Sequence, residues 1–394
     1  MNHSHPEGGV RPGEVPAAAG SPLRVDTDIH NAFPDLLPYL PRVWRDRWSA
    51  TGMGAGWNYS NPRGVSRRDV TPPNGAAPAS DPLFLLSDHL DRYDIDYAVL
   101  TGPGLLPLAN DVDYLNAIAS AYNDVTLDAW LPVSDRYLGS ILINSEDPAG
   151  AVREIRRCAA QGRFVQIIVA AATRKPLGQR DFHPIYEVAS ELGMPVAIHP
   201  GTEGAGTAWP PTPVGWPSRY MEWHNILPIG FMAQINSLVT EGVFEKFPTL
   251  RFVAIEGGVA WLPHLMWRMD KNYKALRDTA PWLKRLPSEY ILDHVVLTTQ
   301  PIEEPANPQH LLQILEMIDA GRTLMFSSDY PHWDFDNPQA ILPGISPELR
   351  ERIMGGTARE VYGLTTRPAR EALPPFTPAE DGVPVAMAQA GPAE

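Results

Sequence analysis

Residues 24–30 read RVDTDIH, an apolar run that ends in Asp28-Ile29-His30. Seven further runs of this kind follow, and most are nearly continuous in hydrophobicity, which is typical of strands buried on both faces. In chain order they are DYAVLTG (96–102), LGSILIN (138–144), FVQIIVA (164–170), PVAIHP (195–200), RFVAIEG (251–257), HVVLTTQ (294–300) and TLMFSSD (323–329). The sequence therefore predicts eight buried strands.

The stretches between these runs have helical periodicity, as in residues 111–130, 147–162 and 307–321. Several begin near Asp or Asn and end at Gly, which are common start and stop signals of helices. Eight strands that alternate with helices favour an α/β protein with one closed (β/α)8 barrel, a TIM barrel. An open doubly wound sheet is the alternative, but no Gly-rich phosphate loop follows any of the strands.

Four segments fall outside this alternation. Residues 31–80 follow the first strand directly and residues 201–223 follow the fifth, so we expect both insertions to cover the carboxyl-terminal mouth, where the active sites of such barrels lie. Residues 1–22 and 366–394 are rich in Gly, Pro and Ala and have little periodicity. We expect them to be disordered tails on either side of a barrel that spans residues 23–365.

Composition excludes several classes of protein. Of 394 residues, 44% are apolar, which is enough for a large core, and 46 acidic against 32 basic residues give a net charge of −14 that disfavours binding to nucleic acid. The sequence has neither an apolar run long enough for a membrane span nor a signal peptide, so we expect a cytoplasmic protein. The single cysteine, Cys158, is expected to pack in the core.

Polar side chains recur at the ends of the predicted strands. Asp28 and His30 end the first strand, and alternation places both on the same side. His199, Glu256, Gln300 and Asp329 end the fifth, sixth, seventh and eighth strands. Any one of these residues could be a hydrogen-bonded strand terminus, but their recurrence at one end favours a divalent metal site. Imidazole and carboxylate ligands suit Zn, Mn, Fe or Co.

Five segments carry a resemblance to a known family. VDTDIHNAFPD (25–35), PVAIHP (195–200), FVAIEGGVAWLPHLMWRMD (252–270), LMFSSDYPHWD (324–334) and ERIMGGTAREVYGL (351–364) resemble the amidohydrolase-related family that is often called amidohydrolase 2. The resemblance covers about residues 24–365. That family includes metal-dependent hydrolases and non-oxidative decarboxylases of aromatic acids.

The resemblance implies a metal set made of Asp28, His30, His199 and Asp329. His30 matches the histidine shared by the family, Asp28 matches the acidic variant of its opening motif, and Ala32 stands where a second histidine would be. His199 and Asp329 match the residues that end the fifth and eighth strands. The family implies Zn or Mn as the metal, and less often Fe.

One position departs from the family pattern. The decarboxylases carry a histidine at the end of the sixth strand, where this chain has Glu256. A glutamate there could be a metal ligand, a general base or a partner of a ligand. Together with His224 and His332 it could bind a second metal, and the alternative is that both histidines are hydrogen-bonding pocket residues.

These expectations lead to a metal-dependent hydrolase or non-oxidative decarboxylase that acts on a small carboxylate-bearing organic substrate. We expect Asp329, Glu256 and His224 to be the catalytic side chains, with Asp329 or Glu256 moving the proton. A dinuclear, iron-type oxygenase is one alternative, and a catalytically inactive partner subunit is another. We also expect a homo-oligomer, with a related chain as a further partner.

Overall fold

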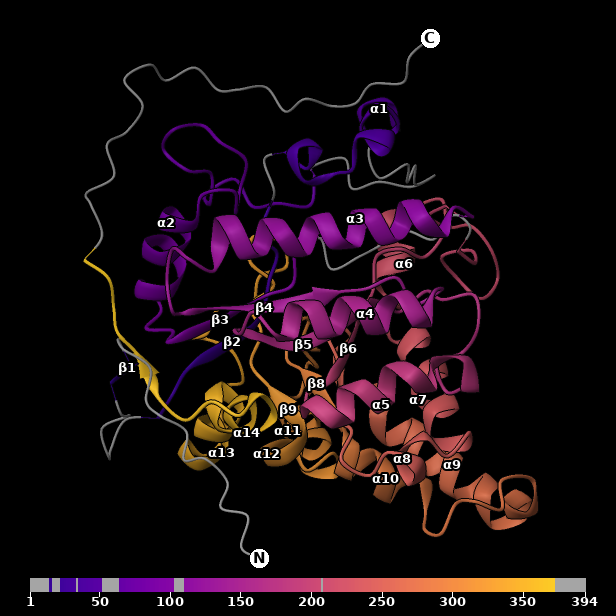
Figure 1. Cartoon of the computed structure of the whole chain (residues 1–394). Coiled ribbons are helices and arrows are strands. Elements are labelled where there is room, and N and C mark those ends of the chain that lie inside the picture. The colour runs from indigo at the N-terminus through magenta and orange to yellow at the C-terminus, as the bar shows by residue number, and fades with distance from the viewer. Residues whose placement is uncertain are drawn as a thin grey trace, which may run out of the picture.

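Eight parallel strands form a barrel in the computed structural model, which describes residues 14–15, 22–32, 35–51, 64–102, 110–206 and 208–372 (Figure 1). The strands are β2 (Val25–Ile29), β3 (Tyr97–Leu100), β4 (Tyr137–Leu142), β5 (Phe164–Ala170), β6 (Val196–His199), β7 (Phe252–Ala254), β8 (Val295–Thr298) and β9 (Leu324–Met325). Each overlaps one of the predicted runs. Neighbouring strands are also consecutive in the chain, which confirms the TIM barrel and excludes the doubly wound order.

The barrel closes between β2 and the residues that follow β9. Thr27 N donates to Phe326 O (3.1 Å) and His30 N donates to Tyr330 O (2.8 Å). The single bridge described between these two segments joins Ile29 to Tyr330, whereas each of the other neighbouring strand pairs forms a parallel ladder, with register shifts in β2–β3 and β4–β5. We call β2 together with residues 326–330 the closing seam.

Helices alternate with the strands and cover the outside of the barrel, as α3, α4 and α5 do in Figure 1. Asp111 and Asp147 cap α3 and α4 with their side chains, which confirms the predicted start signals. The helices are α1 (Arg42–Thr51), α2 (Pro82–Leu85), α3 (Val112–Val125), α4 (Pro148–Ala159), α5 (His183–Leu192), α6 (Tyr220–His224), α7 (Pro228–Thr240), α8 (Val243–Lys246), α9 (Trp261–Leu276), α10 (Pro287–His294), α11 (Pro308–Met317), α12 (Ala320–Thr323), α13 (Pro347–Glu351) and α14 (Thr357–Tyr362).

The core is apolar and continuous between the strands and the helices. Ile155 of α4 and Phe231 of α7 are fully buried in it, and each such side chain contributes about 1.5–3 kcal/mol of burial free energy. Cys158 is also buried, as the helical pattern predicted. Among the helices described, none combines the length and the hydropathy that crossing a membrane requires.

The insertion after the first strand reaches the mouth of the barrel. Its residues 64–67 lie beside the loop that follows β9, where Arg67 N donates to Pro331 O (2.8 Å) and Trp333 N donates to Val65 O (2.8 Å). The insertion therefore covers part of the carboxyl-terminal face. Its residues 33–34 and 52–63 lie outside the described residues.

The segment expected to be a C-terminal tail begins with residues that contact the barrel. Arg367–Pro368 (β10) pairs with Glu14–Val15 (β1), and Arg370 forms an ion pair with Asp94. Arg367 also lies 3.2 Å from Asp96. These contacts are ionic and involve backbone pairing, so a search for a periodic apolar face could not find them. Residues 1–13, 16–21 and 373–394, the remainder of the expected tails, lie outside the described part of the chain.

Candidate metal centre

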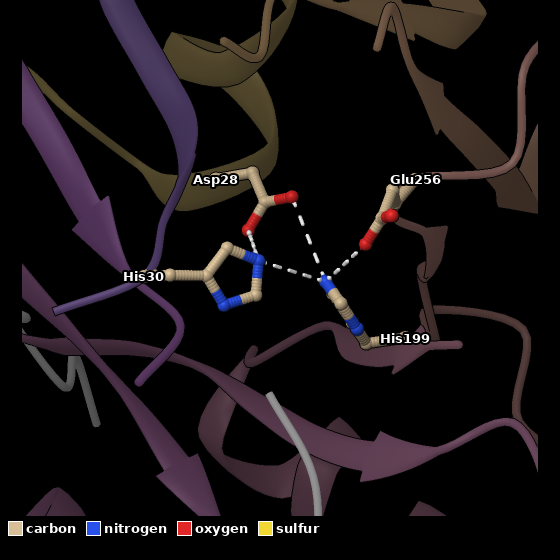
Figure 2. A group of neighbouring side chains, drawn as sticks. All are labelled: Asp28, His30, His199 and Glu256. Atoms are coloured by element: carbon tan, nitrogen blue, oxygen red, sulfur yellow. Dashed lines mark hydrogen bonds and ion pairs between the residues drawn. The ribbon is translucent and has the colours of Figure 1, made fainter. Parts of the chain in front are cut away.

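Four of the polar strand-end residues converge in the mouth of the barrel. Asp28 and His30 come from the end of β2, His199 ends β6, and Glu256 follows β7. All four are buried, and one ligand atom of each lies within 4.8 Å of the others. Figure 2 shows their imidazole and carboxylate groups pointing toward one another.

The orientation of the two imidazole rings is fixed by backbone carbonyl groups. His30 Nδ1 lies 2.9 Å from Gly102 O, and His199 Nδ1 lies 2.7 Å from Pro200 O. A carbonyl oxygen can only accept, so both Nδ1 atoms donate and both Nε2 atoms of the neutral rings carry a lone pair. These Nε2 atoms are 3.2 Å apart, which a cation between the lone pairs would stabilise.

The carboxylates complete a donor set that fits a divalent metal. Asp28 Oδ1 accepts a hydrogen bond from Thr101 (2.7 Å), while Asp28 Oδ2 is buried and has no hydrogen-bond partner among the described residues. Glu256 Oε2 lies 3.0 Å from His199 Nε2. Because a buried carboxylate oxygen without a partner is costly, these atoms suit coordination to a cation.

Asp329 lies beside this group, as predicted. Its Oδ1 is 3.1 Å from His30 Nε2 and 2.7 Å from His332 Nδ1. Its Oδ2 is buried and makes no hydrogen bond to any residue that the structure describes. Of the four predicted ligands, Asp28, His30 and His199 thus form one group with Glu256, whereas Asp329 forms an adjoining group with His30 and His332.

The residues expected to bind a second metal are only partly brought together. His224 and Glu256 form a group with Asp334, whose Oδ2 lies 3.1 Å from His224 Nε2. His332 instead contacts Asp329 and the ring of His30. Asp334 was missed by sequence reasoning, although its place two residues after His332 in LMFSSDYPHWD was a usable signal.

The backbone conformation at Glu256 and Asp329 determines the direction in which their carboxylates point. Glu256 has φ 62° and Asp329 has φ 59°, in the left-handed region that costs a residue with a side chain about 1–2 kcal/mol. Glu256 N donates to Thr298 Oγ1 (3.1 Å), and the carboxylate of Glu303 accepts from Val259 N (3.0 Å) and Ala260 N (2.9 Å). Glu303, which sequence reasoning did not select, therefore holds the turn that follows Glu256.

Burial separates the proton affinities of the acidic side chains. Burial, reinforced by the nearby Asp329 carboxylate, raises the pKa of Glu256, and burial raises the pKa of Asp329 well above its usual range. Burial alone would also raise the pKa of Asp28, but the imidazoles of His30 and His199 hold it at about 2. Glu256 and Asp329 are thus the carboxyl groups whose protonated form this environment favours.

A cavity of about 260 Å³ lies between the loop that follows β6 and the first turns of α7. Its walls are mostly apolar and include Trp209, Pro211 and Trp223. The buried carboxyl group of Glu203, four residues after His199, also lines it, and burial raises the pKa of that group. The cavity is large enough for a single ring.

The chain belongs to the amidohydrolase family, because the model of the family described as "Amidohydrolase" matches residues 25–364. This confirms the resemblance found in the sequence.

Among known proteins, the chain is similar to two groups of decarboxylases. It is 25% identical over 294 residues to the gamma-resorcylate decarboxylase of Polaromonas sp. strain JS666, which covers 70% of this chain and 85% of that protein. It is also 25% identical over 291 residues to the 2-amino-3-carboxymuconate-6-semialdehyde decarboxylase of Dictyostelium discoideum, covering 70% and 75% of the two chains.

A solved structure shares the fold. The 5-carboxyvanillate decarboxylase of Novosphingobium aromaticivorans, complexed with manganese and 4-hydroxy-3-methoxy-5-nitrobenzoic acid, aligns with a TM-score of 0.66 at 20% identity. The alignment covers 90% of this chain and 100% of that one. The relatives are thus decarboxylases, and structural neighbours bind manganese.

Proposed function

We propose that this protein is a metal-dependent, non-oxidative decarboxylase of a small aromatic carboxylate. The observation that carries the proposal is the buried group of Asp28, His30, His199 and Glu256 at the mouth of the barrel. The similarity to decarboxylases supports it, since the relatives act on aromatic or related carboxylates.

The donor set suits manganese, with zinc as the next choice. Two imidazole nitrogens and several carboxylate oxygens are ligands that both ions accept. An ion bound there would supply a Lewis acid that stabilises the negative charge developing on the substrate. Asp28, His30, His199 and Asp329 are the residues that would hold it.

The remaining step is a proton transfer by a side chain of the protein. The bond between the ring carbon and the carboxylate breaks, its electron pair stays on the carbon, and CO₂ leaves. A proton from Glu256 or Asp329 then binds to that carbon, and solvent returns the proton to the carboxylate. Glu256 belongs to the metal group, Asp329 Oδ1 lies 3.1 Å from His30 Nε2, and burial raises the pKa of both carboxyl groups.

The apolar cavity between the loop that follows β6 and α7 suits the ring of such a substrate. Trp209, Pro211 and Trp223 offer flat apolar walls, and small-molecule sites are typically apolar with a few polar groups. The carboxyl group of Glu203, whose Oε2 accepts a hydrogen bond from Gly201 N (2.7 Å), gives this cavity a polar group at one side.

The test is a decarboxylation assay on the manganese-loaded protein with a panel of hydroxylated benzoates, including 2,6-dihydroxybenzoate and 5-carboxyvanillate. We expect release of CO₂ and, in heavy water, one deuterium on the ring carbon that lost the carboxylate. His199→Ala serves as the inactive control. Hydrolysis of an ester or amide panel without CO₂ release from any benzoate would replace the decarboxylase with a hydrolase.

A two-metal oxygenase is the second candidate, because His224, Glu256 and Asp334 form another ligand group next to the first. Elemental analysis and oxygen uptake distinguish it: two iron ions per chain and substrate-dependent oxygen consumption favour the oxygenase. Carefully purified protein that binds no metal favours the inactive subunit. The homo-oligomer, the pairing with a related chain and the cytoplasmic location stay predictions.

A further inference from the structure

We propose that Asp26 and His89 form a positioning pair that fixes the closing seam and thereby sets the geometry of the metal centre, a role that rests on the proposed function. Both side chains are fully buried. His89 Nε2 lies 2.7 Å from Asp26 Oδ2. His89 comes from the π-helical segment η2 (Leu86–Asp91), which lies between the first insertion and β3.

Asp26 joins the backbones of the two segments that carry three of the four predicted ligands, Asp28, His30 and Asp329. Its Oδ1 accepts a hydrogen bond from Ser328 N (2.9 Å) on one side of the seam. The same oxygen accepts from Asp28 N (3.3 Å) on the other side. One carboxylate oxygen therefore connects β2 with residues 326–330, where the two segments share only one described β-bridge.

The same network surrounds the strained backbone at Asp329. The N–H group before it, that of Ser328, donates to Asp26, and the N–H group after it, that of Tyr330, donates to Ser328 Oγ (3.2 Å). Ser328 Oγ also lies 3.3 Å from His89 Nε2. A left-handed backbone persists at a residue with a side chain only where the surroundings impose it. These contacts supply that restraint.

The imidazole of His89 directs its polar contacts toward the seam. Its Nδ1 is buried and, within the described ranges, has no hydrogen-bond partner. The ring is held by aromatic neighbours, with ring centroids 4.8 Å from Tyr330, 5.5 Å from Tyr93 and 5.7 Å from Phe335. The aromatic packing fixes the ring, and the ring fixes Asp26.

The chain offers a matched control in His294. This histidine is also buried, its Nδ1 bonds to Leu250 O (2.8 Å), and its ring stacks on Phe244 at 4.5 Å. It directly precedes β8, at the amino-terminal end of the barrel and therefore opposite the mouth. Loss of His294 should affect stability without affecting the metal centre.

The experiment compares manganese binding in His89→Gln, Asp26→Asn and Asp26→Ala with that in His294→Gln. Free Mn²⁺ is measured by electron paramagnetic resonance during titration of the metal-free full-length protein, and melting temperatures and kcat and KM are measured alongside.

We expect the Mn²⁺ dissociation constant to rise about 10–100-fold in His89→Gln and Asp26→Ala, the usual effect of losing a residue that orients ligands. Asp26→Asn keeps the oxygen that accepts both N–H groups and should bind more tightly than Asp26→Ala. His294→Gln should lose melting temperature and keep its dissociation constant.

A Mn²⁺ affinity within about threefold of the wild type in His89→Gln would overturn the positioning role. If Asp26→Ala does not fold, the result for His89→Gln alone decides whether the pair has this role. Equal loss of affinity in His294→Gln would also overturn it, because the effect would then be general destabilisation. Wild-type protein that binds Mn²⁺ but decarboxylates nothing would overturn the proposed function alone. Wild-type protein that binds no Mn²⁺ would overturn the metal centre and the positioning pair together.

Discussion

The closing seam and the wall formed by β4, β5 and β6 are built from different kinds of residue. In the wall, regular register pairs such as Ile167 with Val196 and Ile168 with Ala197 place apolar side chains next to each other. In the seam, a single bridge is described, and the buried side chains include Asp26, Asp28 and Asp329. The comparison teaches that the apolar pairs of the wall contribute to stability, whereas the seam, where pairing is interrupted, accommodates several buried carboxylates.

Interrupted pairing makes room for the polar groups of the seam. Each buried carboxylate there needs a partner, since an unpaired buried charge is strongly destabilising. Backbone N–H groups satisfy Asp26, whereas Asp28 and Asp329 each keep one buried oxygen that finds no partner in the described chain. Changes in the seam should therefore affect metal binding, whereas changes among the apolar side chains of the wall, which exclude the ligand His199 at the end of β6, should affect only stability.

The largest effect is expected for the two histidine ligands. His30→Ala or His199→Ala removes an Nε2 donor from the centre, so each variant should lose most of its bound metal. Turnover should fall about 10³-fold or more, because the metal stabilises the transition state by several kcal/mol. Elemental analysis and steady-state kinetics measure the two quantities. Full metal occupancy in either variant would remove that histidine from the ligand set.

Glu256→Gln should have the next largest effect. The substitution keeps the volume and one oxygen but removes the acidic proton, so turnover should fall about 10²–10⁴-fold. The metal should remain bound, because Asp28, His30, His199 and Asp329 are intact. Metal content per chain and the rate of CO₂ release are measured together. A loss of one of two bound ions would instead support the two-metal candidate, and near-normal turnover would contradict both roles.

Removing the metal should lower stability by a smaller amount. Free Mn²⁺ at about 100 times its dissociation constant should stabilise the folded state by about 2.7 kcal/mol, which chelation reverses. Differential scanning fluorimetry with and without chelator measures the shift in melting temperature. The shift should vanish in His30→Ala, and an equal shift in that variant would show that the ion acts elsewhere.

The smallest effect is expected in the wall. Ile168 is fully buried in β5, and Ile168→Val removes one methylene group at a cost of about 0.5–1.5 kcal/mol. Denaturant unfolding measures the loss, and Mn²⁺ affinity should not change. A change in affinity comparable to that of a seam variant would show that the wall and the seam are coupled.

Sequence reasoning reached the features that depend on local pattern. Continuous apolar runs identified all eight strands, and the rule that parallel strands end at one face brought Asp28, His30, His199 and Asp329 together. The features that it missed depend on the conformation of turns and on contacts between residues far apart in the chain. The left-handed backbone at Asp329 redirects the loop after it, so that Asp334, not His332, joins His224 and Glu256.

His89 illustrates the same limit. It lies in a helical segment that carries no signal of a functional contact, and the contact with Asp26 spans 63 positions that no periodicity connects. The role of Glu303 was also hidden, because its partners are backbone N–H groups of a distant turn. A sequence pattern reports which face a side chain occupies, but not which distant backbone groups it meets.

The seam also has a consequence for how the protein is made. Ser328 and Asp26, which meet there, are 302 positions apart in the chain. At about 5–20 residues per second, ribosomes need about 15–60 s to synthesise the residues between them. Throughout that interval β2 has no partner on one edge, and Asp28 and His30 lack Asp329. A contact of this sequence separation forms late in folding, so the metal centre is complete only after the rate-limiting step. Bound Mn²⁺ should therefore slow unfolding and leave the rate of folding unchanged.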